Sequence, residues 1–139
     1  MEALISNQNV EIAKRATDAL NRRDWHAFYE LITDDFEWLP AMPGAVQDIA
    51  YRGREEFAAY VHEVEETWEY LRAVMEEFRD LGDRVLLLGH MEGRGRASSV
   101  PVSTPVAEIM DFRDGKLSRD RVLLDHAEAV RAADLDLRE

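Results

Sequence analysis

The acidic residue with the clearest chemical potential is Glu108, because it interrupts an apolar segment. Residues 106–110 read Val-Ala-Glu-Ile-Met. A carboxyl group buried in such surroundings has a raised pKa and is suited to exchange a proton near neutral pH. If Glu108 faces a cavity, it is a candidate general acid or base. The alternative is that it lies on the open face of a sheet and forms an ion pair with Arg121 across a hairpin.

Asp120 is a second candidate because it alternates with Val122 and Leu124 and therefore shares their face of a strand. If that face lines a cavity, Asp120 and Glu108 form a carboxyl pair. Two close carboxyl groups push one pKa upward, which places an acid and a base in one site. The alternative, which the sequence favours, is a solvated Asp120 beside Arg119 near the end of a hairpin.

His90 and Glu92 could also do chemistry together, since residues two apart on a strand share a face. His90 could be a base that Glu92 orients, or both could bind a metal ion. No third ligand is evident, and no two of the four histidines, at positions 26, 62, 90 and 126, have a metal-binding spacing. We therefore expect no metal and no cofactor. The candidate catalytic residues are Glu108, His90 and Asp120.

Large apolar side chains in the first half of the chain are candidates for ligand contacts. Most aromatic residues at helical spacing pack helices together. Trp38 and Met42 flank a loop that would form the mouth of a pocket, and Tyr60 could offer its hydroxyl to a ligand oxygen. The full candidate set is Trp25, Tyr29, Trp38, Met42 and Tyr60.

The remaining sequence predicts the elements that must position these residues. Asp24 and Asp125 are placed to cap the second and the last helix, although Asp125 could instead pair with His126 as a catalytic dyad. Asp114-Gly115 supplies the positive φ of a tight hairpin turn. Apolar periodicity predicts helices at residues 7–21, 25–32, 53–70 and 127–135, and strands at 36–40, 71–79, 84–92, 102–112 and 116–124.

The overall composition is typical of one globular domain, residues 1–139. The formal net charge of −12 repels phosphate backbones and anionic lipids, so we expect neither nucleic acid nor a membrane surface as a partner. The chain has no cysteine, which excludes disulfides and thiolate chemistry. No signal peptide or bilayer-spanning segment is evident, and we expect a cytoplasmic protein.

Several short segments, none of them specific alone, together resemble the SnoaL-like branch of the nuclear transport factor 2 superfamily. The resemblance implies an α+β fold, a cone-shaped barrel of three N-terminal helices packed on a strongly curved antiparallel sheet, with a short C-terminal helix. It also implies a pocket for a small, mainly apolar molecule. The segments are Asp-Trp-x-x-Phe-x-x-Leu at 24–31, Asp-Asp-Phe at 34–36, Tyr-Arg-Gly-Arg-Glu-Glu-Phe at 51–57, Phe-Arg-Asp-Gly-Lys at 112–116, and Asp125 with the helix after it.

This superfamily includes ketosteroid isomerases, limonene-epoxide hydrolases, polyketide cyclases and non-catalytic pocket domains, so the resemblance does not determine an activity. It places Leu39 where the isomerases carry a carboxylate base, and Ala107 where they carry an oxyanion-binding Asp. Glu108 falls where the cyclases carry a His. The catalytic sets of these relatives are therefore broken in this chain.

On the last strand, the resemblance leaves open which residue occupies the catalytic position. The hydrolases and the cyclases carry an Asp there, and Val122 falls closest to its position. A slip of one residue would place Asp120 or Arg121 there instead. Strand alternation alone cannot decide which side chains face a pocket, because bulges near Gly93 and Gly95 could invert the face.

Two functions follow from these observations. The first is a pocket domain with cofactor-free acid/base chemistry of the isomerase, cyclase or hydrolase type. Glu108 would transfer the proton, His90 or Asp120 would assist, and Tyr60 would donate a hydrogen bond. The second is a non-catalytic ligand-binding or interaction domain. Because an exposed apolar sheet face is a liability in a monomer, we expect a homodimer through that face, with contributions from Val102, Ile109, Leu117 and Leu123.

Overall fold

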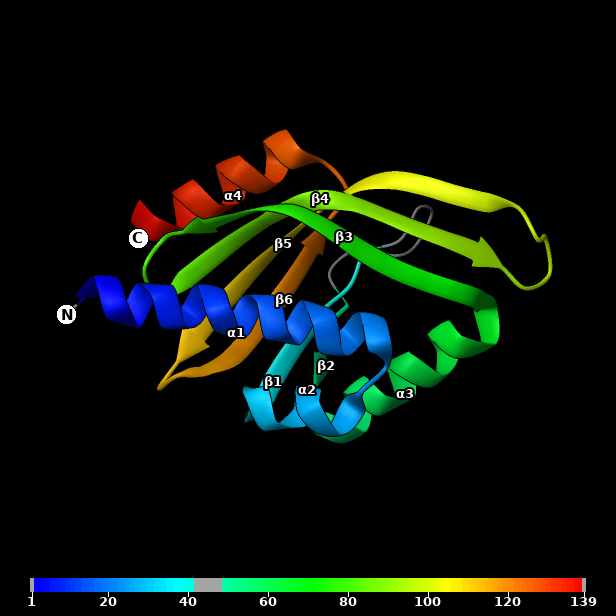
Figure 1. Cartoon of the computed structure of the whole chain (residues 1–139), viewed down its shortest axis with the longest axis horizontal. Coiled ribbons are helices and arrows are strands. Elements are labelled where there is room, and N and C mark those ends of the chain that lie inside the picture. Colours follow the sequence, from blue (N-terminus) through cyan, green and yellow to red (C-terminus); the bar gives the residue numbers. More distant parts are fainter. Residues whose placement is uncertain (1, 42–48, 139) are drawn as a thin grey trace.

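The chain folds into four helices and one six-stranded sheet in a computed structural model that describes residues 2–41 and 49–138 (Figure 1). The predicted α+β class is confirmed. The helices are α1 (Glu2–Arg22), α2 (Trp25–Leu31), α3 (Gly53–Thr67) and α4 (His126–Arg138). The strands are β1 (Ile32–Leu39), β2 (Tyr51–Arg52), β3 (Trp68–Asp80), β4 (Arg84–Gly95), β5 (Pro101–Arg113) and β6 (Lys116–Leu123). Their order across the sheet is β2-β1-β6-β5-β4-β3.

The sheet is mixed, which corrects the expectation of an antiparallel sheet. β1 and β6 are parallel, whereas the other neighbouring strands are antiparallel. Short turns in a sequence indicate antiparallel neighbours, but a parallel neighbour needs a long crossover connection. Here the crossover is the whole chain between β1 and β6. It includes α3, so the third helix follows two strands instead of preceding the sheet.

One face of the sheet, here called the inner face, carries the main hydrophobic core. Val85, Leu87 and Met110 point from the strands into this core. Ala13 of α1 and Phe57 of α3 pack in the same cluster. The small side chains along the buried stripe of α1, at positions 13, 16 and 19, let the helix backbone lie close to its neighbours.

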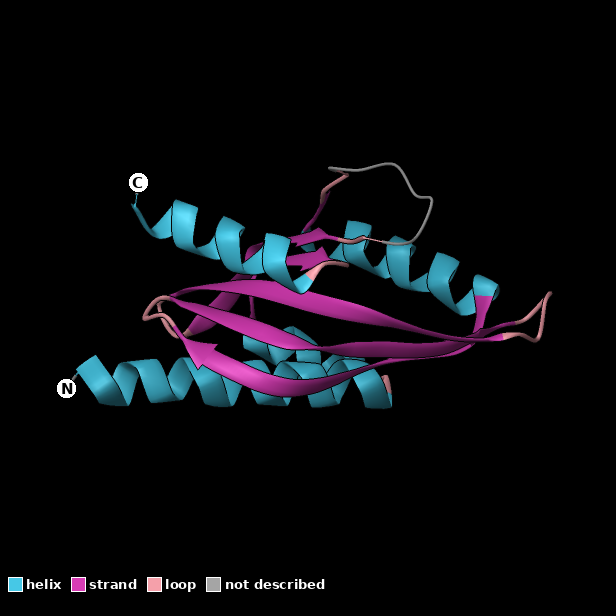
Figure 2. Cartoon of the chain, turned by 90° about the horizontal axis from the view of Figure 1, so that it is seen from above, coloured by secondary structure: helices cyan, strands magenta, loops and turns pink. Residues whose placement is uncertain are grey.

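The opposite face of the sheet, the outer face, is partly covered by α4. Figure 2 shows α1 and α4 on opposite sides of the sheet. Leu86, Ile109 and Leu123 of the outer face pack against Ala129 and Ala133 of α4. The sheet residues 106–110 are therefore buried from both sides.

The predicted free sheet face is accordingly corrected in part. Ile109 and Leu123 are buried beneath α4, and Leu117 belongs to the inner core. Only Val102 of that predicted set is exposed. The sequence pattern identified apolar positions but did not show that the last helix returns to cover them.

Two predicted caps and the predicted hairpin are confirmed. The Ala27 backbone N–H donates to Asp24 Oδ1 (3.2 Å), and the Glu128 N–H donates to Asp125 Oδ1 (2.8 Å). Asp114 and Gly115 have φ values of 53° and 78°, as the tight turn requires. Several boundaries differ. α1 begins at Glu2 rather than near residue 7, β1 begins at Ile32 rather than at residue 36, and α3 ends at Thr67 because the next residues join β3. No helix in the described ranges is long and apolar enough to cross a membrane.

Gly89 of β4 provides a direct test of this packing. A Cβ atom at position 89 would lie 2.0 Å from the carbonyl oxygen of Val74, where β3 is bulged. We expect Gly89→Ala to lower the free energy of unfolding by about 2–3 kcal/mol. Gly115→Ala, whose cost comes from φ alone because the space around it is open, should lose about 1 kcal/mol. Urea denaturation measures both, and equal losses would contradict the close approach at Gly89.

Candidate functional site

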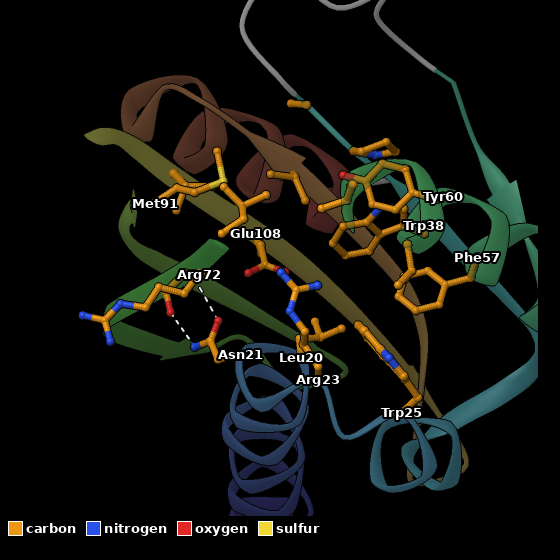
Figure 3. A pocket seen from close by; sticks show the side chains of 18 residues that line it. Leu20, Asn21, Arg23, Trp25, Trp38, Phe57, Tyr60, Arg72, Met91 and Glu108 are labelled. Carbon is orange, nitrogen blue, oxygen red and sulfur yellow. Dashed lines mark hydrogen bonds between the residues drawn. The ribbon is translucent and has the colours of Figure 1, made fainter. Parts of the chain in front are cut away.

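A cavity lies between the C-terminal end of α1, helix α3 and the inner face of the sheet (Figure 3). Its empty space is about 780 Å³, a figure that includes the open solvent at the mouth. Most of the lining is apolar. Val106 and Val122 lie beside Glu108 on the strands, Met91 adds a sulfur, and Leu20 closes the α1 side.

Aromatic side chains from three different elements, α2, β1 and α3, form one wall of the cavity. Phe57 of α3 is central: its ring centroid lies 5.6 Å from Trp38, 6.2 Å from Trp25 and 5.1 Å from Phe28. Trp38 also lies 5.7 Å from Tyr60. Because edge-to-face and stacked contacts of this kind restrict each ring, the wall is held in one arrangement before any ligand binds.

The strand register brings Glu108 and Asp120 together on the inner face. Glu108 of β5 is opposite Val122 of β6, and Asp120 is opposite Met110, so the two acids are diagonal neighbours. Glu108 is 5% exposed and Asp120 is fully buried. No N–H or hydroxyl group in the described part of the chain donates a hydrogen bond to Glu108 Oε1 or to either carboxyl oxygen of Asp120. The acid pair is thus buried without a donated hydrogen bond at these three oxygens.

Burial raises the pKa of both carboxyl groups. For Glu108 the removal of water is the main cause, and the hydrogen bond with Asp120 partly offsets it. For Asp120 burial is again the first cause, and the charge of Glu108 and the hydrogen bond between them add to it, so its pKa lies well above the usual range. The pair therefore keeps a proton to a higher pH than a solvated Asp or Glu would, and it can take up or release one beside the cavity.

Both simpler interpretations of these acids are wrong. Asp120 is not solvated beside Arg119, because it lies in the inner core. Glu108 does not pair with Arg121, which is opposite Ile109 and therefore on the outer face. Leu117 and Asp120 both face inward because Ser118 is an extra residue in the ladder between β5 and β6, where its hydroxyl donates to the Asp111 carbonyl (3.0 Å).

Tyr60 is a hydrogen-bond donor at the cavity wall. Burial raises its pKa to about 12, and the charges of Tyr51 and Glu108 contribute in the same direction. The phenol therefore keeps its proton throughout the physiological range. It can donate a hydrogen bond to a ligand oxygen but cannot act as a base there.

The structure does not bring His90 to the cavity. Its side chain lies on the outer face, between Glu76 (Nδ1–Oε1, 3.1 Å) and Glu92 (Nε2–Oε2, 3.0 Å). The hydrogen bond with Glu76 and then that with Glu92 raise the pKa of His90. Within residues 2–41 and 49–138, no group of three His, Cys, Asp or Glu side chains is arranged to hold a metal ion.

The other residues predicted from the sequence have mixed positions. Trp25, Trp38 and Tyr60 line the cavity. Tyr29 packs behind the wall, 6.4 Å from Phe57, and outside the lining. Met42 lies outside the described residues.

His126 has a structural contact that excludes the Asp–His dyad considered above. Its Nε2 lies 2.8 Å from the carbonyl oxygen of Gly89 and 3.0 Å from that of Val106. Since carbonyl oxygens only accept, this nitrogen donates to both strands. His126 therefore fixes the start of α4 on the outer face, while Asp125 caps the helix.

Two cavity residues at the end of α1 were missed by the sequence analysis. The Asn21 side chain donates to the Ala73 carbonyl (2.7 Å) and accepts from the Ala73 N–H (2.9 Å), which ties α1 to the edge strand β3. Arg23 follows the last residue of α1 with a φ of 57° and lines the cavity. In the sequence, residues 21–24 look like an ordinary polar link between two helices. Their place beside the cavity depends on the exact residue at which α1 ends.

Comparison with known proteins gives one family match. The model of the SnoaL-like domain matches residues 13–120. A search of curated proteins finds no match.

Many solved structures share the fold. An NTF2-like protein of unknown function from Burkholderia pseudomallei is 20% identical over 89% of this chain and 95% of that chain, with a TM-score of 0.76. TerC, co-crystallized with polyporic acid, is 20% identical over 91% and 98%, with a TM-score of 0.75. A hypothetical protein with a ketosteroid isomerase-like fold from Catenulispora acidiphila, in complex with trimethylamine, is 17% identical over 89% and 92%, with a TM-score of 0.71. At these identities the likeness establishes the fold alone.

The buried acid pair makes stability depend on pH. The unfolded chain releases the Asp120 proton near the usual pKa of Asp, whereas the folded chain retains it to a higher pH. The native protein should therefore lose stability as pH rises above about 4. Asp120→Asn removes this loss, and we expect the variant to be about 1–2 kcal/mol more stable than the native protein at pH 8. Urea denaturation at pH 5 and pH 8 measures the difference.

The control for this test is Asp114→Asn at the exposed hairpin turn, where Asn tolerates the left-handed conformation equally well. Asp114→Asn should show the same change in the free energy of unfolding between pH 5 and pH 8 as the native protein. A loss of stability in Asp120→Asn at pH 8 would show that Asp120 is ionised in the fold.

Proposed function

Because the chain belongs to the SnoaL-like domain family, we propose that its cavity binds a small, mainly apolar metabolite and that Glu108 exchanges a proton with it. The chemistry is cofactor-free and of the isomerase, cyclase or hydrolase type. The observation that carries the proposal is the buried Glu108–Asp120 pair in an otherwise apolar cavity. Buried acids without a cation are costly to keep, and they recur where a protein needs proton transfer.

Each residue of the proposed site has a separate role. Glu108 lines the cavity and is the acid or base that contacts the ligand. Asp120 lies behind the cavity lining and keeps the shared proton available. Tyr60 donates a hydrogen bond to the ligand oxygen on which charge develops, and Trp38 packs against the ligand. His90 has no part in this site, because it faces the other side of the sheet.

The comparisons support a small-molecule ligand in general terms. Structures of similar fold hold polyporic acid in one case and trimethylamine in another. These ligands differ in size and charge, so the fold accommodates several classes of molecule. The choice of ligand in this chain must therefore come from its own lining residues.

Glu108→Gln tests the catalytic role. The amide keeps the size and polarity of the side chain but cannot exchange the proton. With hydrophobic ketones, lactones and epoxides as a substrate panel, we expect turnover to fall about 100- to 10,000-fold while ligand affinity changes little. Steady-state rates and calorimetric binding measure the two effects.

Glu76→Gln is the matched control, because Glu76 is exposed and faces the other side of the sheet. Unaltered turnover in Glu108→Gln would refute the role of Glu108. Binding without turnover in the native protein would replace the proposed enzyme by a non-catalytic ligand-binding domain.

We also propose that the protein forms a homodimer through the part of the sheet that α4 leaves uncovered. Beyond α4, Tyr70 on the outer face of β3, Val102 on the inner face of β5 and Val100 just before β5 are exposed, at 42%, 37% and 57%. Figure 1 shows this end of β3, β4 and β5 extending beyond α4. Apolar exposure of this kind is typical of an interaction surface.

Light scattering at micromolar concentration should give the mass of a dimer. Val102→Glu should shift the protein towards the monomer, because a charge is costly to bury in an interface. Gly115→Ala at the distant hairpin should leave the mass unchanged. A native protein that is monomeric under these conditions would contradict the proposal.

A further inference from the structure

Arg23 occupies a position where the backbone favours glycine. It follows the last residue of α1, its N–H donates to the Leu20 carbonyl (3.2 Å), and the Asp24 N–H donates to the Ala19 carbonyl (2.9 Å). Its φ of 57° lies in the left-handed region. Helices commonly end with this conformation, and glycine is the usual residue because a Cβ atom is unfavourable there. The arginine side chain at this point needs a reason beyond helix termination.

The Arg23 side chain extends from the end of α1 into the cavity (Figure 3). Within residues 2–41 and 49–138, its one ion pair is a long contact with Glu65 of α3 (3.9 Å), where both side chains are about one-third to one-half exposed. A contact of this length and exposure holds a guanidinium only weakly. The donors of Arg23 are therefore accessible to a ligand at the mouth.

The second arginine of the lining differs in this respect. Arg72 is bound to Glu92 through Nε (3.0 Å) and through a terminal nitrogen (2.9 Å), and that pair lies on the outer face. Figure 3 shows its guanidinium pointing away from the cavity. Among the described lining residues, Arg23 is thus the cation that faces the ligand space.

The surroundings of Arg23 restrict the shape of the ligand. Trp25, two residues further along, belongs to the aromatic wall with Phe57 and Trp38. Flat rings pack well against such a wall. The planar fork of a guanidinium matches a carboxylate or an enolate, with two parallel hydrogen bonds.

We propose that the ligand of the cavity is a flat, apolar ring compound with one anionic oxygen group, a carboxylate or an enolate, and that Arg23 binds this group. The inference rests on the proposed function, since it names the substrate class of the same site. Arg23 exchanges its weak contact with Glu65 for the ligand anion. The apolar part of the ligand then lies along the aromatic wall.

The test compares 2-naphthoate with 2-naphthamide, which have the same ring and differ in charge, by calorimetry near neutral pH. The native protein should bind naphthoate about tenfold more tightly than naphthamide. Arg23→Gln should abolish this preference and Arg23→Lys should retain part of it. Arg22→Gln is the matched control, because Arg22 is exposed and pairs with Asp18 (2.8 Å) outside the cavity. It should leave the preference unchanged.

Arg23→Gly separates binding from folding. Glycine relieves the left-handed backbone, so we expect Tm to rise by about 3 °C while the preference for naphthoate is lost. A preference that persists in Arg23→Gln and Arg23→Gly would overturn the assignment of Arg23. If the native protein binds both compounds equally, the anionic class is wrong while the proposed cavity stands. If it binds neither compound, the proposed function fails together with the inference.

Discussion

The burial of two carboxyl groups, with no cation paired to them in the described part of the chain, is the constraint on which the rest of this structure depends. An ionised carboxylate in an apolar interior costs several kcal/mol, and a second one beside it costs more. Glu108 and Asp120 therefore share a proton, and the surrounding layers must supply the stability that the pair removes. The aromatic cluster around Phe57 on one side of the sheet and α4 on the other provide that packing. The acids are tolerated because the rest of the core is apolar and closely packed.

The strand register follows from the same constraint. A shift of one residue in β5 would move Glu108 beneath α4 and bring Ala107 into the cavity. Position 107 faces Ala129 and Ala133 of α4, where a small side chain lets the helix approach the sheet. The two adjacent residues thus meet opposite requirements, a small apolar group outside and an acid inside. The positions of α4 and of the cavity are coupled through this one strand.

A structural feature could be predicted from the sequence where residues close together in the chain determine it. Caps and tight turns are local, and Asp24, Asp125 and Asp114-Gly115 act as predicted. The face of Glu108 is not a local property, because residues 106–110 are buried on both sides and show no alternation. Asp120 was misjudged since its charged neighbours suggest a solvated segment. The parallel pairing of β1 with β6 joins distant parts of the chain, and neither a turn nor a period in the sequence encodes it.

Two locally unfavourable features of the described chain lie at the same cavity. Three non-glycine residues have a positive φ: Asp114 lies in the hairpin turn, Ser99 in the connection before β5, and Arg23 at the cavity. The first two serve the turns in which they lie, whereas a glycine would end α1 better than Arg23 does. The buried acid pair is the second such feature and borders the same cavity. Unfavourable local choices persist where they perform a function, so an arginine at the mouth and acids within the wall of one cavity are two independent reasons to place the chemistry of this protein there.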